Sequence, residues 1–369
     1  MLSSIPITPP QWFQTVFKMS DAGAAVNLRR QGAALATCDR RRRRPGFWAR
    51  RKRAARFCLC PPRALADNRA QYSGKCAGAR LMPELPEVET VRRGLEPFLA
   101  GAVITAVTAR RPDLRIALPS DFARRLSGAR VLALGRRGKY LTADLSTGET
   151  LILHLGMSGR FTIARDQSVQ RPGQFHQAGS TNPRHDHVVL AVAGPAGCGA
   201  IVYNDPRRFG FMDLVSTAAR DDCRHFRDMG PEPLGPDFSA PALQAALAGR
   251  RAPLKSALLD QSVVAGLGNI YVCEALWRAR LSPRRPAGRL SAAAAGRLHG
   301  AIRAVLQEAI DAGGSSLRDF AASDGAPGYF QHRFAVYDRA GAPCPACGAP
   351  VRRFVQSGRS TFACGKCQK

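Results

Sequence analysis

Apolar residues recur at helical spacing shortly after residue 82 and again through the last third of the chain. Val88, Val91 and Leu95 stand at positions i, i+3 and i+7, which predicts a short helix, and Pro86 suits its first turn. The same periodicity predicts four later helices, at 241–247, 254–259, 271–278 and 291–312. We therefore expect a helical second half of the chain.

Short runs rich in β-branched residues lie between the first helix and the later ones, separated by glycine, proline and polar residues. They predict strands at 103–107, 131–134, 140–145, 151–155, 187–192 and 200–203. Short strands at regular spacing are typical of an antiparallel sandwich or barrel. The fold class is therefore predicted as α+β, with a β domain at 82–215, a Gly/Pro-rich hinge at 230–236 and a helical domain at 230–330.

Residues 1–81 differ from the rest of the chain. They contain the arginine runs 40–44 and 50–53 and show no sustained period of 2 or 3.6, so we expect a disordered basic extension. Its composition resembles a transit peptide, a nucleic-acid-binding tail, or GC-rich DNA translated upstream of the true start codon. We favour the last origin, and expect residues 1–81 to be absent from the cellular protein or removed from it.

The charge of the chain points to a polyanionic partner, most simply nucleic acid. The sequence has 55 Lys and Arg against 27 Asp and Glu, a formal charge of +28. Residues 1–81 contribute 17 basic and three acidic residues, so residues 82–369 keep a charge of +14. The nucleic-acid interpretation is thus independent of the extension. No run of 18 or more apolar residues occurs, so no membrane partner is expected.

Four of the 11 cysteines end the chain as Cys344-x2-Cys347-x16-Cys364-x2-Cys367. Two CxxC pairs at this spacing predict a tetrahedral zinc site with four thiolate ligands, in a module at 335–369. Two strands between the pairs, joined through 356–359, place Arg359 at or beside the tip of a hairpin. The basic residues around this site offset its negative charge or contact phosphate; they are Arg352, Arg353, Lys366 and Lys369.

The remaining cysteines of the body, Cys198, Cys223 and Cys273, are scattered in apolar or mixed surroundings. We expect ordinary buried or half-buried thiols there rather than reactive ones. A single clustered metal site without a disulfide framework favours a reducing compartment.

Several motifs, in this order and spacing, resemble the formamidopyrimidine-DNA glycosylase family of bacterial repair enzymes. They are the segments 83–90 (PELPEVET), 137–141 (RGKYL), 154–159 (HLGMSG), 205–210 (DPRRFG) and 266–271 (GLGNIY), followed by the zinc tail. The related endonuclease VIII branch shares the Pro-Glu start, but the continuation 85–90 resembles the former. So does 323–330, which is similar to that family's mobile loop over the damaged base.

The resemblance implies a bifunctional glycosylase and lyase that excises 8-oxoguanine and ring-opened purines from duplex DNA. Pro83 would attack the sugar C1′, which requires a free secondary amine, because the nitrogen of an internal proline is a tertiary amide. Glu84 would be the proton donor, and Lys139 would donate a proton during base loss and β-elimination. Arg359 corresponds to the residue assigned to δ-elimination, although its place also suits direct phosphate or lesion contact.

Further residues are matched to the family's DNA-contacting positions. His185, Arg207, Arg250, Lys255 and Asn269 are expected to contact phosphates, with Gly268 allowing close backbone approach. Met157, Arg207 and Phe209 resemble the trio that fills the gap left by the extruded base, although core packing is the alternative for Met157 and Phe209. Arg318 departs from the pattern, since many relatives have lysine there.

The resemblance also implies the architecture and the setting. We expect an N-terminal β-sandwich, a C-terminal helical domain with a helix-two-turn-helix element, and a four-cysteine zinc finger with one zinc ion per chain. The expected partner is damaged double-stranded DNA, bound by a monomer in the bacterial cytoplasm at the nucleoid. The competing hypothesis, if the extension is retained, is a non-catalytic zinc-dependent protein that binds damaged DNA.

Overall fold

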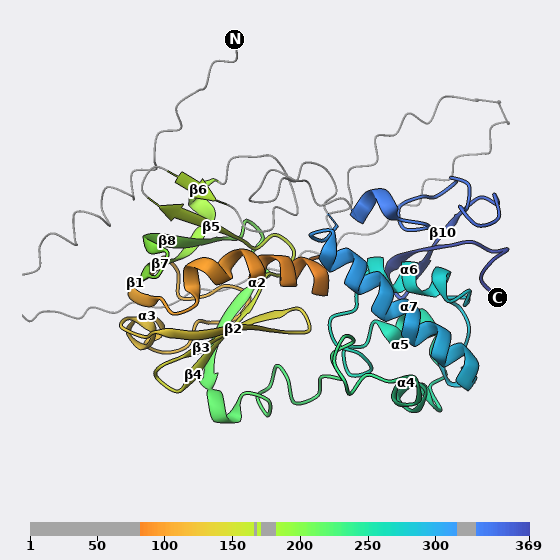
Figure 1. Cartoon of the computed structure of the whole chain (residues 1–369), viewed down its shortest axis with the longest axis horizontal. Coiled ribbons are helices and arrows are strands. Elements are labelled where there is room, and N and C mark those ends of the chain that lie inside the picture. The colour runs from red at the N-terminus through yellow and green to blue at the C-terminus, as the bar shows by residue number, and fades with distance from the viewer. Residues whose placement is uncertain (1–81, 166–167, 171–181, 316–329) are drawn as a thin grey trace, which may run out of the picture. The chain divides into compact units, whose positions relative to one another are not determined.

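The computed structural model describes residues 82–165, 168–170, 182–315 and 330–369 (Figure 1). These described residues all belong to one compact unit. The predictions made for the extension, for Arg318 and for 323–329 lie outside the described residues.

The predicted first helix is confirmed as α2 (Leu85–Leu99). Its apolar face is buried, with Val88, Val91 and Leu95 at most 2% exposed. Glu84 is the N-cap, and its backbone nitrogen donates to the Glu87 carboxylate at 3.0 Å, one half of a capping box. Local sequence therefore fixes where this helix begins.

Two antiparallel sheets follow, and together they form the β-sandwich-like domain. One has the order β1-β7-β8-β5-β6, built from Val103–Ala109, Asp186–Gly194, Gly197–Asn204, Arg160–Arg165 and Ser168–Gln170. The other has the order β2-β3-β4-β9, built from Val131–Arg137, Tyr140–Leu145, Glu149–His154 and Phe211–Ser216. Helix α2 contacts β2 and β3 of one sheet and β7 of the other (Figure 1). The six predicted strands are confirmed, while β5, β6 and β9 were missed.

Three short helical segments connect these strands: α3 (Phe122–Leu126), η1 (Pro183–His185) and η2 (Thr217–Ala219). The apolar faces of both sheets and of α2 share one hydrophobic core. Four of the central strands, β4, β5, β7 and β8, each carry four or five consecutive buried residues.

The second half is helical, as predicted. Its elements are α4 (Ala240–Leu247), α5 (Leu254–Leu258), α6 (Asn269–Arg278), η3 (Ala287–Arg289), α7 (Ala292–Asp311) and η4 (Phe330–Arg333). Helix α7 packs against α4, α6 and α2, so the helical half contacts the helix that opens the β domain. The hinge 230–236 contains neither helix nor strand.

The zinc module carries the predicted hairpin, β10 (Arg352–Gln356) with β11 (Arg359–Ala363). Gln356 pairs with Arg359, so the turn consists of Ser357 and Gly358, both at positive φ (48° and 71°). Two positive φ values are typical of the tight hairpin turn. Arg359 therefore lies beside the tip, in the first position of β11.

A buried carboxylate attaches this module to the helical half. Glu274 on α6 is 0% exposed and accepts hydrogen bonds from the backbone nitrogens of Ala335, Val336 and Tyr337, at 2.8–3.0 Å. Strand β11 also packs against α6. The segment that leads into the module is thus held by one side chain.

Of the three scattered cysteines, Cys273 is buried and Cys223 half-buried, as expected, but Cys198 is exposed. The expectation for Cys198 was wrong because it lies at the β7–β8 hairpin turn, paired with Ala193 next to the end of the ladder. Among the described residues, no helix is long and apolar enough to cross a membrane.

Candidate active site and DNA interface

Pro83 and Glu84 lie at the N-terminus of α2, against the start of α6. Pro83 is buried and Met82 is 37% exposed. Glu84 is 3% exposed, and its carboxylate accepts from the backbone nitrogen of Ile270 at 2.9 Å and from that of Tyr271 at 3.5 Å. The free N–H groups of one helix thus hold the carboxylate that caps another.

Two glycines of the segment 266–271 make this contact possible. A Cβ on Gly268 would lie 2.2 Å from the Glu84 carboxyl carbon, and one on Gly266, at φ +78°, would lie 2.7 Å from Leu85. Gly268 was expected to allow close approach to a ligand; in this structure the close approach is to Glu84. Any side chain there would displace the carboxylate.

Burial raises the pKa of Glu84 from its usual value of 4.5 to about 7, and the nearby Glu87 carboxylate adds to the shift. The Lys139 ammonium and the N–H groups of Ile270 and Tyr271 oppose the rise in pKa. Near neutral pH, Glu84 therefore has both a protonated and an ionised population, as a proton donor requires.

Lys139 lies in the turn between β2 and β3, directly after Gly138, which has φ +55°. The hinge residue Glu232 holds this turn: its carboxylate accepts from the backbone nitrogen of Gly138, from Arg136 at 2.8 Å and from Arg137 at 3.2 Å. The lysine is half-buried. Burial lowers the pKa of Lys139, and the Arg359 charge lowers it further, while Glu84 and Glu87 raise it.

Arg359 is exposed on the hairpin, and its neighbour Ser360 is held from two sides. The ammonium of Lys255 and the side-chain nitrogen of Asn269 each donate to the Ser360 carbonyl at 3.0 Å. Lys255 also donates to the Thr361 hydroxyl at 2.8 Å. These bonds fix the start of β11, where the Arg359 charge lowers the pKa of Lys139.

The predicted catalytic residues therefore come together from three separate parts of the chain. Lys139 interacts electrostatically with both Glu84 and Arg359. Pro83 is covalently next to Glu84. The Lys139 ammonium thus interacts electrostatically with both the carboxyl group next to Pro83 and the Arg359 guanidinium.

We expected Lys255 to contact a DNA phosphate, but the residue is buried inside the protein. Its side chain is buried, the residue being 1% exposed, and two of its three donors are used within the protein. Arg250 donates to Asp260 at 2.8 Å, and both side chains are partly exposed, so a phosphate would compete with that carboxylate. Asn269 and His185 are half-buried.

Met157, Arg207 and Phe209 lie on two adjacent turns of the β domain. Phe209 is 43% exposed, although aromatic side chains usually avoid water, and the Arg207 guanidinium lies 4.6 Å from the centre of its ring. Core packing, the alternative for Phe209, is thereby excluded. Met157 is half-buried.

Glu87 and Tyr271 belong to the site in ways that sequence reasoning did not assign. The Glu87 carboxylate accepts from the Tyr271 hydroxyl and, at 2.8 Å, from the backbone nitrogen and the hydroxyl of Ser315. Both residues stand inside the motifs 83–90 and 266–271, but neither was given a role there. A glutamate three residues after an N-cap was the available signal for a capping role.

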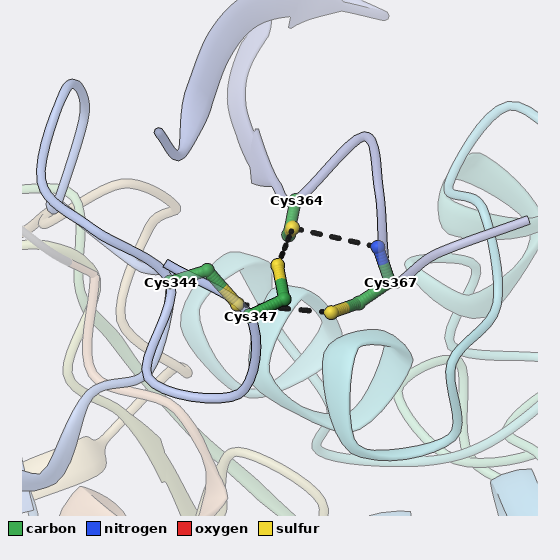
Figure 2. Close-up of side chains that lie close together, drawn as sticks. All are labelled: Cys344, Cys347, Cys364 and Cys367. Carbon is green, nitrogen blue, oxygen red and sulfur yellow. Dashed lines mark hydrogen bonds between the residues drawn. The ribbon is translucent and has the colours of Figure 1, made fainter. Parts of the chain in front are cut away.

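The four terminal cysteines form the predicted metal site. Their sulfur atoms lie within 4.8 Å of one another and point to a common centre (Figure 2). Zn–S bonds of about 2.3 Å in a tetrahedron place sulfurs about 3.8 Å apart, so one zinc ion fits. Trp277 on α6 donates its indole N–H to the Cys344 sulfur at 3.3 Å, an outer contact typical of structural zinc sites.

Comparison with protein families divides the chain into three matched segments. Residues 82–212 match the formamidopyrimidine-DNA glycosylase N-terminal domain, and residues 229–321 match the formamidopyrimidine-DNA glycosylase H2TH domain. Residues 341–369 match the zinc finger found in FPG and IleRS.

Individual proteins are similar over the same part of the chain. The formamidopyrimidine-DNA glycosylase of Brucella canis is 57% identical over 292 residues, which cover 78% of this chain and all of that protein. The crystal structure of the MutM (FPG) protein from Thermus thermophilus is 41% identical, with a TM-score of 0.65, covering 78% of this chain and 98% of that one. A complex of a Lactococcus lactis FPG mutant with Fapy-dG containing DNA gives 34% identity and a TM-score of 0.67, covering 78% and 100%.

Proposed function

This chain belongs to the formamidopyrimidine-DNA glycosylase family, and from that premise we propose that it excises oxidised purines from duplex DNA and then cleaves the strand. The observation that carries the proposal is that Glu84, covalently next to Pro83, and Arg359 both interact electrostatically with Lys139. With a free Pro83 amine, these groups would supply a nucleophile, a proton donor near its titration point and two cations for the phosphates that flank the nucleotide.

The first step is nucleophilic attack. The free amine of Pro83 would bond to C1′ of the extruded nucleotide, while the sugar ring opens or the bond between C1′ and the base breaks. Protonated Glu84 would give its proton to the opening sugar oxygen or the departing base. Once the attacking nitrogen has lost its proton, its lone pair expels whichever of these two groups remains on C1′ and forms an iminium with C1′, the Schiff base.

Strand cleavage follows from the iminium. Because its positive charge acidifies the C2′ proton, a base removes that proton and the C3′–O bond breaks, which is β-elimination. Lys139 is suited to proton transfer in this sequence, since burial and Arg359 lower its pKa. Arg359 is placed to assist δ-elimination, in which the C5′–O bond breaks, through contact with the departing phosphate.

We further propose that the active form begins at Pro83. In the 369-residue chain this nitrogen carries Met82 and has no lone pair available for attack. The family match begins at residue 82, one residue before this proline. A free α-amine titrates at roughly 7.7–8.0, so part of it is unprotonated near neutral pH. Initiation at Met82 followed by methionine removal would expose it.

DNA binding would use both halves of the protein. Phe209, with Met157 and Arg207, is suited to fill the gap left by an extruded base, because insertion offsets part of the unstacking cost. His185, Arg250 and Asn269 remain candidates for phosphate contact. We infer a monomer that acts in the bacterial cytoplasm at the nucleoid, where its substrate lies.

Borohydride trapping tests the proposal. A chain that begins at Pro83 should form a covalent adduct with an 8-oxoguanine duplex, while the 369-residue chain should not. The matched control is the same trimmed chain with Pro83→Gly, which replaces the secondary amine by a primary one and should trap more slowly. If the Pro83 chain binds the duplex without trapping, the Schiff-base assignment fails, and the non-catalytic damaged-DNA-binding alternative gains support.

A further inference from the structure

Asp205 follows β8 directly and is 0% exposed. One carboxylate oxygen accepts from the backbone nitrogen of Gly210 at 2.9 Å and from the Tyr203 hydroxyl at 3.3 Å. The other accepts from the Ser158 hydroxyl and from the backbone nitrogen of Arg207, the latter at 3.3 Å. Four donors therefore satisfy a carboxylate that the reaction described above does not use.

Tyr203 lies on β8 itself, and the other three donors come from two different turns. Ser158 belongs to the turn after β4, which carries Met157, whereas Arg207 and Gly210 belong to the turn between β8 and β9, which carries Phe209. The Ser158 hydroxyl joins them directly, because it donates to Asp205 and accepts from the Arg207 backbone nitrogen at 3.2 Å.

Backbone packing holds the same two turns together. A Cβ on Gly156 would lie 2.3 Å from the carbonyl carbon of Phe209, so the first turn lies directly on the second. The nitrogen of Gly156 donates to Nδ1 of His154 at 3.0 Å, which fixes the first turn at its start. Arg208 adopts φ +55°, a strained conformation for an arginine that the surrounding contacts must stabilise.

We propose that Asp205 and Ser158 are positioning residues for base extrusion, because they couple the turn that carries Met157 to the turn that carries Arg207 and Phe209. The inference rests on the proposed function. Insertion into a duplex costs a few kcal/mol of unstacking per step. If the two turns are rigid, their side chains are already ordered before they enter the DNA. Insertion then loses less conformational entropy, which leaves more of the binding free energy to offset unstacking.

A purely structural role makes a different prediction. If Asp205 only closes the connection from β8 to β9, then its loss lowers stability and slows every activity of the enzyme alike. A positioning role instead affects the step that requires extrusion of a stacked base. An abasic nucleotide has no base to unstack, so covalent trapping on it depends far less on the inserted side chains.

The test compares two substrates, using the chain that begins at Pro83. Ser158→Ala removes the hydroxyl that joins the turns and leaves the bonds of Asp205 to Gly210 and Tyr203. Single-turnover excision of 8-oxoguanine from a duplex should fall about tenfold, the worth of a hydrogen bond to a charged group. Borohydride trapping on an abasic duplex should change less than about twofold. Ser127→Ala, which removes an exposed hydroxyl bonded to the Ala123 carbonyl at 2.8 Å, is the matched control.

The double variant separates coupling from general damage. If Ser158 acts through Asp205, adding Ser158→Ala to Asp205→Asn should cause no further loss of excision. The proposal is overturned if Ser158→Ala excises 8-oxoguanine as fast as the wild type, or if it loses excision and abasic trapping equally. It is also overturned if the loss of excision in the double variant is the product of the losses in the two single variants. Failure of the wild-type chain to trap an abasic duplex would instead refute the Schiff-base function itself.

Discussion

The carboxylate of Glu84 accepts a hydrogen bond from the backbone nitrogen of Ile270, 186 residues away in sequence, at 2.9 Å. This bond attaches the start of α2 to the start of α6 within a buried site. Because burial dominates its environment, Glu84 binds a proton more tightly in the folded chain than in the unfolded one.

The raised pKa of Glu84 predicts a loss of stability as pH rises. The folded pKa is about 7 and the ordinary value 4.5, so the folded state binds more protons between these values and its stability falls across that window. The wild-type chain should lose about 3 kcal/mol from this group between pH 4 and pH 8, and Glu84→Gln should not. Urea unfolding at a series of pH values measures this free energy. The 369-residue chain is used because its Pro83 nitrogen is an amide and does not titrate. Glu96→Gln, at a partly exposed position on the same helix, is the control. If the free energy of unfolding of Glu84→Gln differs from that of the wild type by the same amount at every pH, the raised pKa of Glu84 is contradicted.

Arg359→Ala should change the products of cleavage rather than the formation of the adduct. The side chain is exposed, so its removal leaves the fold intact. We expect δ-elimination to slow by about 100-fold, leaving the β-elimination product as the main one on a sequencing gel. Arg289→Ala removes an exposed arginine elsewhere in the helical half and should give wild-type products. Unchanged products from Arg359→Ala would restrict this residue to DNA contact.

Zinc removal should release the hairpin. Cys364→Ser should abolish the zinc content of one ion per chain. It should also weaken DNA binding, because zinc then no longer holds together the open end of the β10–β11 hairpin. Metal analysis and hydrogen exchange over 352–363 measure these effects. Cys198→Ser is the matched control, since Cys198 lies outside the cluster and is exposed. Retention of one zinc by Cys364→Ser would refute the ligand assignment.

The buried position of Lys255 predicts a result different from that of a phosphate contact. Lys255→Ala should leave the salt dependence of DNA affinity unchanged, since its charge is directed at Ser360 and Thr361. It should destabilise the fold by about 1–3 kcal/mol, because Thr361 loses a buried partner. Arg359→Ala, by contrast, should reduce the salt slope by about one unit if Arg359 contacts phosphate. A one-unit reduction in Lys255→Ala would restore the phosphate assignment.

Much of the fold could be predicted because its signals are local. The spacing of Val88, Val91 and Leu95 and the CxxC pairs each depend on a few neighbouring residues. The strands β5 and β9 were missed although each begins directly after a glycine, at a boundary of the expected kind. β5 pairs with β8 and β9 pairs with β4, each across a long sequence separation. This pairing stabilises the two strands, and local strand preference does not reveal it.

The site likewise has residues that local motifs predict and features that only the folded chain shows. Motif resemblance found Pro83, Glu84 and Lys139 because each stands in a short pattern. Burial and charge pairing are properties of the folded chain, so the buried state of Lys255 was not visible in sequence. The same holds for the bonds of Asp205, whose partners come from two turns that are 47 residues apart.

Gly268 leaves space for the Glu84 carboxylate that no larger residue could leave. The proton donor lies at the start of the β domain, while the N–H groups that hold its carboxylate and the glycine that leaves room for it belong to the helical half. The two halves are therefore not interchangeable modules. A chimaera that combines the β domain of one relative with the helical half of another would have to match at residues 84 and 268 before any property of its DNA-binding surface became relevant.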